Sequence, residues 1–329
     1  MDYLAIDFTT FPLRALRARL TNEVLSIADF SQGPSSLAAE ADWLSRWIKT
    51  KRGFLNPTHL LAIWDSPDLS IRTSPIQMAP AAAAETSKDP TDTANQQKQE
   101  TPAAEELHLH CRLPSYQTAG QPTALPLHLS ARLPRHPIDV LFTRLCQLHG
   151  SCRKISILPM SLWSAYLASY PQYAEQTTAL IWGARQTLTI LVVSRGYLVF
   201  CRHFPHSLNT EPSEALPRTD GAQVKEALEQ FSFLFPYTTL DHLLVGGLIK
   251  DTDYLTAWLE GVSDCPCELI APLGSNRIVL SSGENPQNDS HSLSAYWPCM
   301  GIIWELHYPW KSCYTPSPAN KEEPHHAAA

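Results

Sequence analysis

The sequence predicts an α/β protein built by duplication, because one order of elements occurs twice in 329 residues: a meander of strands, a helix, a strand and a helix. In the first copy we expect strands at residues 3–8, 13–20, 24–30 and 59–64 and helices at 37–53 and 137–149. In the second copy we expect strands at 179–182, 187–193, 197–203 and 242–245 and helices from 220 and over 254–261. The repeat predicts two equivalent lobes facing each other across a cleft.

Turn and cap residues delimit the first elements. Phe11-Pro12 and Thr21-Asn22-Glu23 interrupt the opening apolar runs, which indicates turns between strands. Ser35 or Ser36 can cap a helix whose apolar residues recur at helical spacing and which stops near Gly53.

The following region combines strands with a segment that lacks core residues. Residues 59–64 form a continuous apolar run, and we expect residues 69–76 to be the hairpin partner of that strand. From 79 to 104 almost no large apolar residue occurs, so the segment cannot offset its ordering entropy and is predicted to be disordered. Two further strands are expected at residues 107–113 and 125–133.

The helix expected at 137–149 has Gly150 as its C-terminal cap. Its apolar stripe is predicted to consist of Val140, Leu141, Leu145 and Leu148. A strand at 154–158 and a helix at 160–169 follow.

The second copy has tight turns at residues 183–186 and 194–196. Asp220 is the expected cap of its long helix, and the last helix is expected to close at Gly261. The predicted buried residues of the long helix are Val224, Leu228 and Phe231.

Composition excludes several classes of protein. The chain is 44% hydrophobic and has 25 basic against 32 acidic residues, a net charge of −7, which argues against a protein that mainly coats nucleic acid or an anionic membrane. No apolar run approaches the roughly 20 residues of a spanning helix, and the acidic start does not resemble a signal peptide. We therefore expect a cytoplasmic protein with no membrane span.

The eight cysteines are scattered and lack the paired spacing of a zinc site, so we interpret most of them as buried thiols. Cys265-Pro266-Cys267 suits a strand edge or turn better than a redox loop. His108 and His110, near Cys111, could ligate a metal, but solvent-side strand residues are the favoured interpretation.

Four segments resemble the actin-like ATPase superfamily and, within it, the PilM family of type IV pilus assembly proteins. They are Ile6-Asp7-Phe8-Thr9-Thr10, the second turn Ile181-Trp182-Gly183-Ala184-Arg185-Gln186-Thr187, Leu244-Val245-Gly246-Gly247, and the closing helix at 296–303. The resemblance covers about residues 1–305. It implies a duplicated actin-like (RNase H-like) fold with two lobes and a small inserted subdomain.

The resemblance also implies a nucleotide site in the cleft. In such proteins glycines let backbone N–H groups approach the phosphates, and an acid before each turn holds Mg²⁺. The matching positions, which form a degenerate nucleotide-binding site, are Asp7, Thr9, Thr10, Gly183, Thr187, Gly246 and Gly247. Asp7 as a strand-end turn residue and the glycines as plain turn residues remain open alternatives.

Two departures from the family pattern decide the prediction about catalysis. Thr9 stands where the first turn has glycine, and Ile181 stands where the second turn has its acid. We therefore assign no catalytic and no metal-binding residue and expect no required cofactor. Weak binding of ATP and Mg²⁺ stays open.

The predicted domains are a first lobe beginning at 1–78, a disordered loop at 79–104, an inserted subdomain at 105–150, a return to the first lobe at 151–172, a second lobe at 173–305 and a tail at 306–329. The resemblance implies a non-catalytic cytoplasmic scaffold of a type IV pilus or type II secretion-like platform, peripheral to the inner membrane. Its expected partner is the cytoplasmic tail of a PilN-like inner-membrane protein, held in a groove beside residues 107–113 and 125–132 through backbone hydrogen bonds.

Two alternatives remain. The first is an active actin-like ATPase or small-molecule kinase with an unusual metal site. The second is the cytoplasmic domain of a GspL-like secretion protein, which shares the fold but continues into a membrane helix, whereas residues 315–329 here are polar.

Overall fold

The computed structural model describes residues 1–51, 58–75, 106–116, 125–205, 216–248, 252–271, 276–281 and 293–307. The first lobe contains a six-stranded sheet in the order β14-β3-β2-β1-β4-β8. Its strands are β1 (Asp2–Asp7), β2 (Arg14–Thr21), β3 (Val24–Gln32), β4 (Thr58–Trp64), β8 (Cys152–Ile157) and β14 (Ile278–Leu280). The predictions for residues 79–104, Gly53 and the tail beyond residue 307 lie outside the described residues.

The second lobe repeats this topology in a five-stranded sheet of order β11-β10-β9-β12-β13. Its strands are β9 (Thr177–Gly183), β10 (Thr187–Ser194), β11 (Tyr197–Pro205), β12 (His242–Gly247) and β13 (Cys267–Leu269). In both sheets the first strand lies between its antiparallel successor and the parallel strand that follows the first helix. The predicted duplication is therefore confirmed at the level of strand order.

The inserted sheet has the order β5-β7-β6 and is antiparallel. Its strands are β5 (Ser70–Pro75), β6 (Glu106–Tyr116) and β7 (Leu125–Pro134). The expectation that residues 69–76 pair with the preceding strand is wrong. Strand β4 already has β1 on one side and β8 on the other, so it has no free edge, and the turn closed by the Leu69 N–H to the Ser66 carbonyl directs β5 to a separate sheet.

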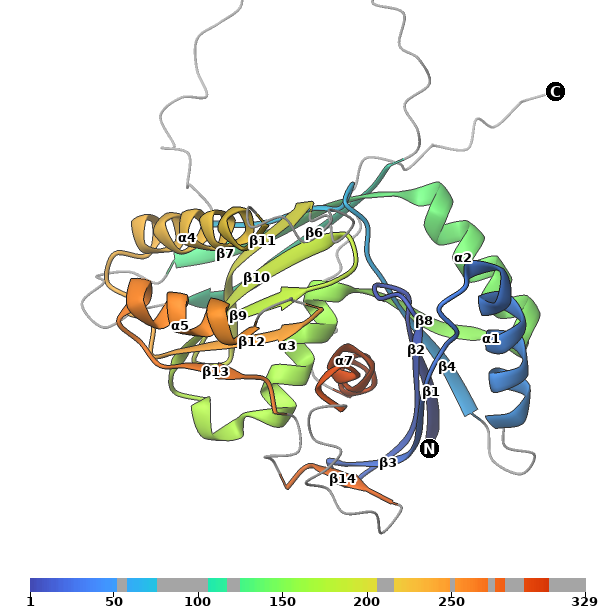
Figure 1. Ribbon diagram of the computed structural model, residues 1–329. Helices are drawn as coiled ribbons and strands as arrows, with labels where there is room; N and C mark the ends of the chain where they lie inside the picture. The colour runs from blue at the N-terminus through green and yellow to red at the C-terminus, as the bar shows by residue number, and fades with distance from the viewer. Residues whose placement is uncertain are drawn as a thin grey trace, which may run out of the picture.

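Helices cover the outer faces of both large sheets and fill the space between them (Figure 1). α1 (Leu37–Lys51) and α2 (Arg135–His149) pack on the outer face of the first sheet, where Leu44, Ile48 and Leu145 join its core. α4 (Leu216–Leu234) and α5 (Thr252–Ser263) cover the second sheet. α3 (Leu158–Ser169) and α7 (Trp297–Glu305) lie between the sheets, so close together that a Cβ at Gly301 would stand 1.8 Å from the Ser161 carbonyl oxygen.

The helix ends agree with the predictions in part. Gly150 ends α2 in the left-handed conformation (φ 89°), and its N–H donates to the Cys146 carbonyl over 2.7 Å, as expected. Val140, which directly precedes Leu141, is 52% exposed and so does not belong to the buried stripe. None of the helices in the described residues combines the length and apolar composition needed to cross a membrane.

Two predicted ends in the second lobe are wrong. α4 begins at Leu216, so Asp220 lies inside the helix; Pro217 permits this because proline is tolerated in a first helical turn. α5 continues through Gly261 to Ser263 and stops where Asp264 adopts a left-handed φ of 52°. A Cβ at Gly261 would meet nothing within 4 Å, so the glycine is simply tolerated on a helix surface.

The cysteine predictions are confirmed where the structure describes them. Cys152, Cys201, Cys265 and Cys299 are buried free thiols, and Cys267 begins the edge strand β13. Burial raises the pKa of the Cys152 thiol to about 11, as expected for an unreactive thiol. Among the described residues, no group of three or more His, Cys, Asp or Glu is arranged to hold a metal ion.

Candidate functional site

The residues of the predicted site gather at the carboxyl ends of three strands. Asp7 ends β1, Gly183 ends β9, and Thr187 begins β10. Thr9 and Thr10 lie in the turn after β1, and Gly246 and Gly247 end β12. The turn after β1 and the turn after β9 therefore face each other between the lobes.

The two turns are in direct contact. The Arg185 N–H donates to the Thr9 carbonyl over 2.9 Å, and the Arg185 guanidinium lies 4.6 Å from the centre of the Phe11 ring. A backbone N–H of the second turn is thereby used by the first turn. In this arrangement the space that phosphates would need between the turns is bridged by the protein's own backbone.

The paired glycines are explained by this same contact region. Gly247 has φ 91°, and a Cβ there would stand 2.1 Å from the Gly183 carbonyl oxygen, which also accepts the Leu248 N–H over 2.7 Å. A Cβ at Gly246 would lie 2.9 Å from the Trp182 ring. Close packing alone therefore favours glycine at both positions, against backbone at Gly247 and against the Trp182 ring at Gly246.

Asp7 is fully buried and only half satisfied. Its Oδ1 accepts the Thr9 N–H over 2.8 Å, whereas its Oδ2 has no hydrogen-bond partner among the described residues. Burial raises the pKa of the Asp7 carboxyl to about 6; hydrogen bonding from Thr9 opposes the shift, and the nearby Asp65 carboxylate adds to it. Because burial removes water from this carboxyl and one of its oxygens has no donor, its ionised form is destabilised relative to its neutral form.

The second turn offers no carboxylate to complete a metal site. Ile181 is buried in β9 between Ile190 of β10 and Val245 of β12. Its side chain can bind neither a cation nor the water of a hydrated one. With an isoleucine in place of the acid of the second turn and the Arg185 N–H already bonded to the first turn, the residues present do not fit a Mg²⁺–triphosphate group held by both lobes.

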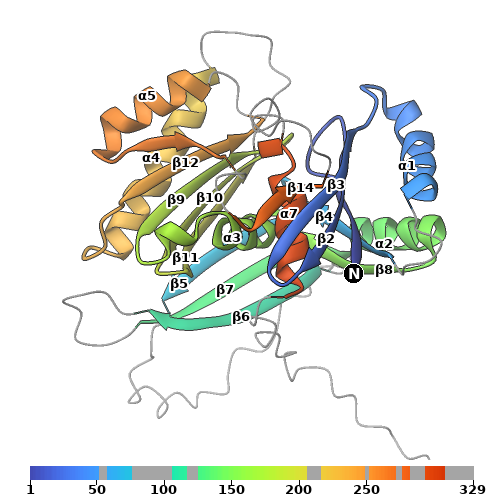
Figure 2. The same cartoon turned by 90° about the horizontal axis from the view of Figure 1, so that it is seen from below.

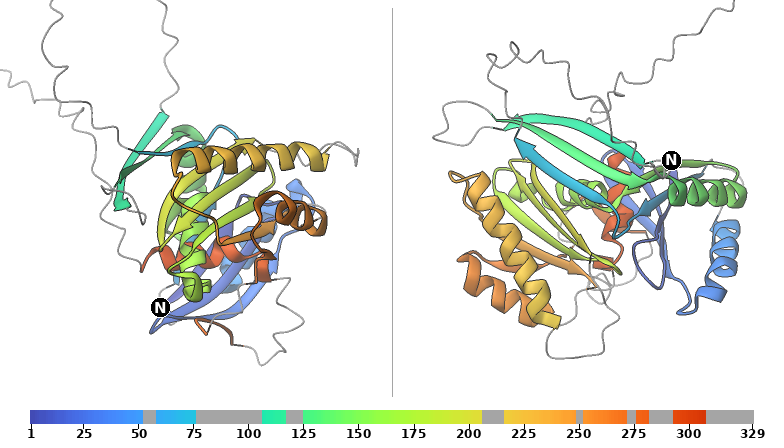
Figure 3. Two further views of the ribbon diagram at one scale, coloured as in Figure 1. Left: turned by 90° about the vertical axis from the view of Figure 1, so that its left-hand side faces the viewer. Right: turned by 90° about the horizontal axis from the view of Figure 1, so that it is seen from above.

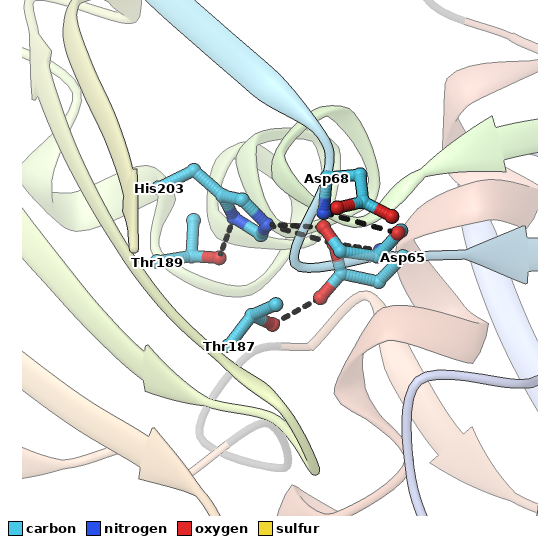
Figure 4. Close-up of polar contacts among 6 residues, drawn as sticks. Asp65, Asp68, Thr187, Thr189 and His203 are labelled. Atoms are coloured by element: carbon cyan, nitrogen blue, oxygen red, sulfur yellow. Dashed lines mark hydrogen bonds and ion pairs between the residues drawn. The ribbon is translucent and has the colours of Figure 1, made fainter. Parts of the chain in front are cut away.

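A carboxylate that sequence reasoning missed does bridge the lobes (Figure 4). Asp65, the first residue after β4, accepts a hydrogen bond at Oδ2 from the Thr187 hydroxyl of β10. Its Oδ1 lies 3.1 Å from Nε2 of His203, which belongs to β11. Both side chains are buried, the His203 side chain being 0% exposed and that of Asp65 4%.

The partners of His203 determine that its Nε2 carries a hydrogen. Nε2 faces two acceptors, the Asp65 carboxylate and the Ser66 carbonyl at 3.2 Å, so it must carry a hydrogen. Nδ1 lies 3.0 Å from the hydroxyl of Thr189 on β10. The five residues form one hydrogen-bonded network that joins the end of β4 to two strands of the other lobe.

This network has the residue types of a hydrolase triad but not its accessibility. Asp65, His203 and Thr189 are connected in the order carboxylate, imidazole, hydroxyl, yet Thr189 is fully buried, so no substrate can reach its oxygen. The arrangement instead holds the lobes together. The sequence carried one usable signal, an acid at the carboxyl end of a buried strand.

The surface cavities lie elsewhere. One of about 690 Å³ opens beside the end of α4 between Leu228 and Asp264, and one of about 330 Å³ beside β2 contains Asp2, Arg17 and Arg19. Neither is lined by residues of the two turns or of the Asp65 network.

The lobes, the repeated strand order and the cleft define an actin-like ATPase fold. A PilM–PilN type IV pilus biogenesis complex is similar over 93% of this chain and 98% of that chain, with a TM-score of 0.63 and 9% identity. An actin-like protein of unknown function from Bacteroides thetaiotaomicron is similar over 91% and 95%, with 11% identity and a TM-score of 0.45. The ethanolamine utilization protein EutJ from Carboxydothermus hydrogenoformans is similar over 92% of this chain and 89% of that chain, with 7% identity and a TM-score of 0.42. No protein-family model and no curated protein sequence matches the chain, and at such identities the similarity shows the fold alone.

We expect Asp7→Asn to stabilise the protein at about pH 7.5 and to leave it nearly unchanged at about pH 4. Because the folded-state pKa is raised from 3.8 to about 6, wild-type stability falls as the pH rises through this window and the buried carboxyl ionises. The expected gain in the free energy of unfolding at neutral pH is about 1–3 kcal/mol, measured by urea denaturation. If the variant instead loses stability at neutral pH, the ionised carboxylate of Asp7 is stabilised by its surroundings and the prediction is wrong.

We expect Asp65→Ala and His203→Ala each to lower the free energy of unfolding by about 2–4 kcal/mol, because each leaves a buried polar partner unsatisfied. The double variant should cost clearly less than the sum, which a double-mutant cycle measures. Asp68→Ala is the matched control, since Asp68 lies in the same turn but is exposed, and it should change stability by less than about 0.5 kcal/mol. Additive single effects would contradict a coupled network.

Proposed function

We propose that the protein is a non-catalytic scaffold of a type IV pilus or related secretion platform, and that it binds the cytoplasmic tail of a PilN-like inner-membrane protein. The similarity in fold to the PilM–PilN complex supports the kind of platform. The observation that carries the non-catalytic assignment is the hydrogen bond between Arg185 and Thr9 across the cleft, together with the apolar Ile181.

The proposed docking site is the groove beside the inserted subdomain, residues 105–150. Strand β6 is eleven residues long and lies at the edge of the inserted sheet, with β7 as its only strand partner in the described residues. An extended tail can pair with such an edge, because the unpaired N–H and C=O groups of the strand provide a ladder of donors and acceptors. In this proposal the chain is cytoplasmic and is held at the inner membrane by its partner.

In this proposal the second lobe, predicted at residues 173–305, supports the first, and β14 from this range adds an edge strand to the sheet of the first lobe. The network of Asp65 and His203 makes the two lobes one body, so the groove is presented with little conformational freedom. A preformed groove lowers the entropy lost when a flexible tail is ordered.

We expect a synthetic peptide with the sequence of the cytoplasmic tail of a PilN-like inner-membrane protein to bind with micromolar affinity by calorimetry. Two adjacent variants, Leu109→Pro and His110→Pro, test the strand-edge mode. Successive N–H groups of a strand point to opposite edges, so one proline removes a donor from the open edge and the other removes one from the β6–β7 ladder.

The open-edge proline should abolish peptide binding while leaving thermal stability nearly intact, and the ladder proline should lower stability. Equal peptide affinity in wild type and in the stable proline variant would exclude strand addition at β6. Absence of binding to any tail of this kind would contradict the partner.

We also expect MgATP to bind no more tightly than about 1 mM, because the second turn lacks its acid and the two turns contact each other. Thr9→Gly is the matched variant: it removes the branched side chain from the first turn but leaves Ile181, so it should gain no affinity. Micromolar, Mg²⁺-dependent binding in calorimetry would favour the alternative of an active nucleotide hydrolase or kinase.

A further inference from the structure

The outer face of the inserted sheet is made of alternate residues of β5, β7 and β6. In β5, Ile71 and Thr73 are buried against the core, whereas Ser70 is exposed. In β7 the buried positions are Leu127, Leu129, Ala131 and Leu133, whereas Arg132 is exposed and Ser130 partly so. The even-numbered positions of both strands therefore belong to the outer face.

Strand register brings cationic and titratable residues together on this face. The three cross-strand rows are Ser70, Arg132 and His108; Arg72, Ser130 and His110; and Ser74, His128 and Arg112. The nine positions hold three arginines, three histidines, three serines and no acid. We call this set the cationic face.

The cationic face lies on the outside of the molecule. In Figures 2 and 3 the sheet β5-β7-β6 forms one flank of the molecule, and no described helix or strand covers its outer surface. The acidic residue at the margin of the face is Glu106, which pairs in register with Pro134, and beyond it the exposed Asp139 of α2 is already paired with Arg135 at 3.2 Å. None of the nine positions in the three rows is an acid.

The net charge of −7 does not reveal such a face. The basic residues of the face come from three segments, the farthest of which are Arg72 and Arg132, 60 positions apart, so no basic run is visible along the sequence. Only the pairing of β5 with β7, which the sequence did not predict, places them in adjacent rows.

The size and chemistry of the cationic face indicate its ligand. With strands about 4.8 Å apart and about 3.4 Å per residue, three rows on three strands cover roughly 10 by 14 Å, the area of a few lipid headgroups. None of the nine positions carries a large apolar residue that could fix the register of a bound peptide. Mobile anionic headgroups can adjust to any spacing of cations, which a folded acidic partner cannot.

We propose that the cationic face binds anionic phospholipid headgroups directly. The interaction is electrostatic, so it weakens as salt screens the charges. Histidine gains its positive charge as the pH falls from about 8 to 5, so the face becomes more cationic and binding tightens in that direction. The inference does not depend on a PilN-like partner, because the lipid alone is the ligand.

The test is co-sedimentation of the full chain with vesicles of phosphatidylcholine containing about 30% phosphatidylglycerol, against vesicles of phosphatidylcholine alone. We expect several-fold more protein to sediment with the anionic vesicles, and less when the salt is raised from about 0.05 to 0.5 M. The triple variant Arg72→Ser, Arg112→Ser and Arg132→Ser should fall to the background of the neutral vesicles.

The matched control removes the same charge from the outer helices. Arg46→Ser, Lys49→Ser and Arg144→Ser alter exposed cations of α1 and α2 and should sediment like wild type. Urea denaturation of both triple variants checks that each remains folded. A second variant, His108→Ser with His110→Ser and His128→Ser, should keep the binding at about pH 7.5 but lose its increase at about pH 6.

Equal sedimentation of the two arginine variants, or of wild type with anionic and neutral vesicles, would overturn the proposal. So would tight binding of a fluorescent hexaglutamate peptide by a protein that does not sediment with anionic vesicles, since that result assigns the face to an acidic protein segment. None of these outcomes bears on whether a membrane-protein tail binds at β6, so the two proposals fail independently.

Discussion

The burial of the Asp65 carboxylate between the lobes is the constraint on which the arrangement of the cleft depends. A buried carboxylate is tolerated only when its oxygens are hydrogen-bonded, and both oxygens of Asp65 find their partners on strands of the opposite lobe. Separating the lobes would leave the Asp65 carboxylate and the His203 imidazole without each other. The network therefore opposes separation of the lobes, because separation would leave buried polar groups without their partners.

Closure by this route uses the groups that a nucleotide would need. The Thr187 hydroxyl donates to Asp65, and the Arg185 N–H donates to Thr9, so two donors of the second turn are occupied by the first lobe. Asp7 is buried with a raised pKa, and Ile181 stands in the second lobe where the resemblance places an acid. These features occur together: contacts between the lobes already engage groups of both turns.

The fold could be predicted from the sequence where local patterns and the repeat agree. The meanders, the buried strands and the Gly150 cap follow from periodicity and turn chemistry alone. The pairing of β5 could not be predicted, because a strand near a buried one resembles a hairpin partner until its neighbour is known to have both edges filled. The contact of Asp65 with His203 spans 138 residues by number, and no local pattern encodes such a partner.

A molecule locked in this way can still act through surfaces that need no motion of the lobes. Among the described residues β6 has β7 as its only strand partner, and the cationic face lies on the same sheet, so the two proposed binding surfaces belong to one small subdomain. The buried side of the sheet packs on β11, where the Cys201 N–H donates to the Thr73 hydroxyl over 2.9 Å, and this ties the subdomain to the second lobe. In the proposed scaffold, the joined lobes serve as the base on which the inserted sheet is mounted, and this role does not require them to bind a nucleotide.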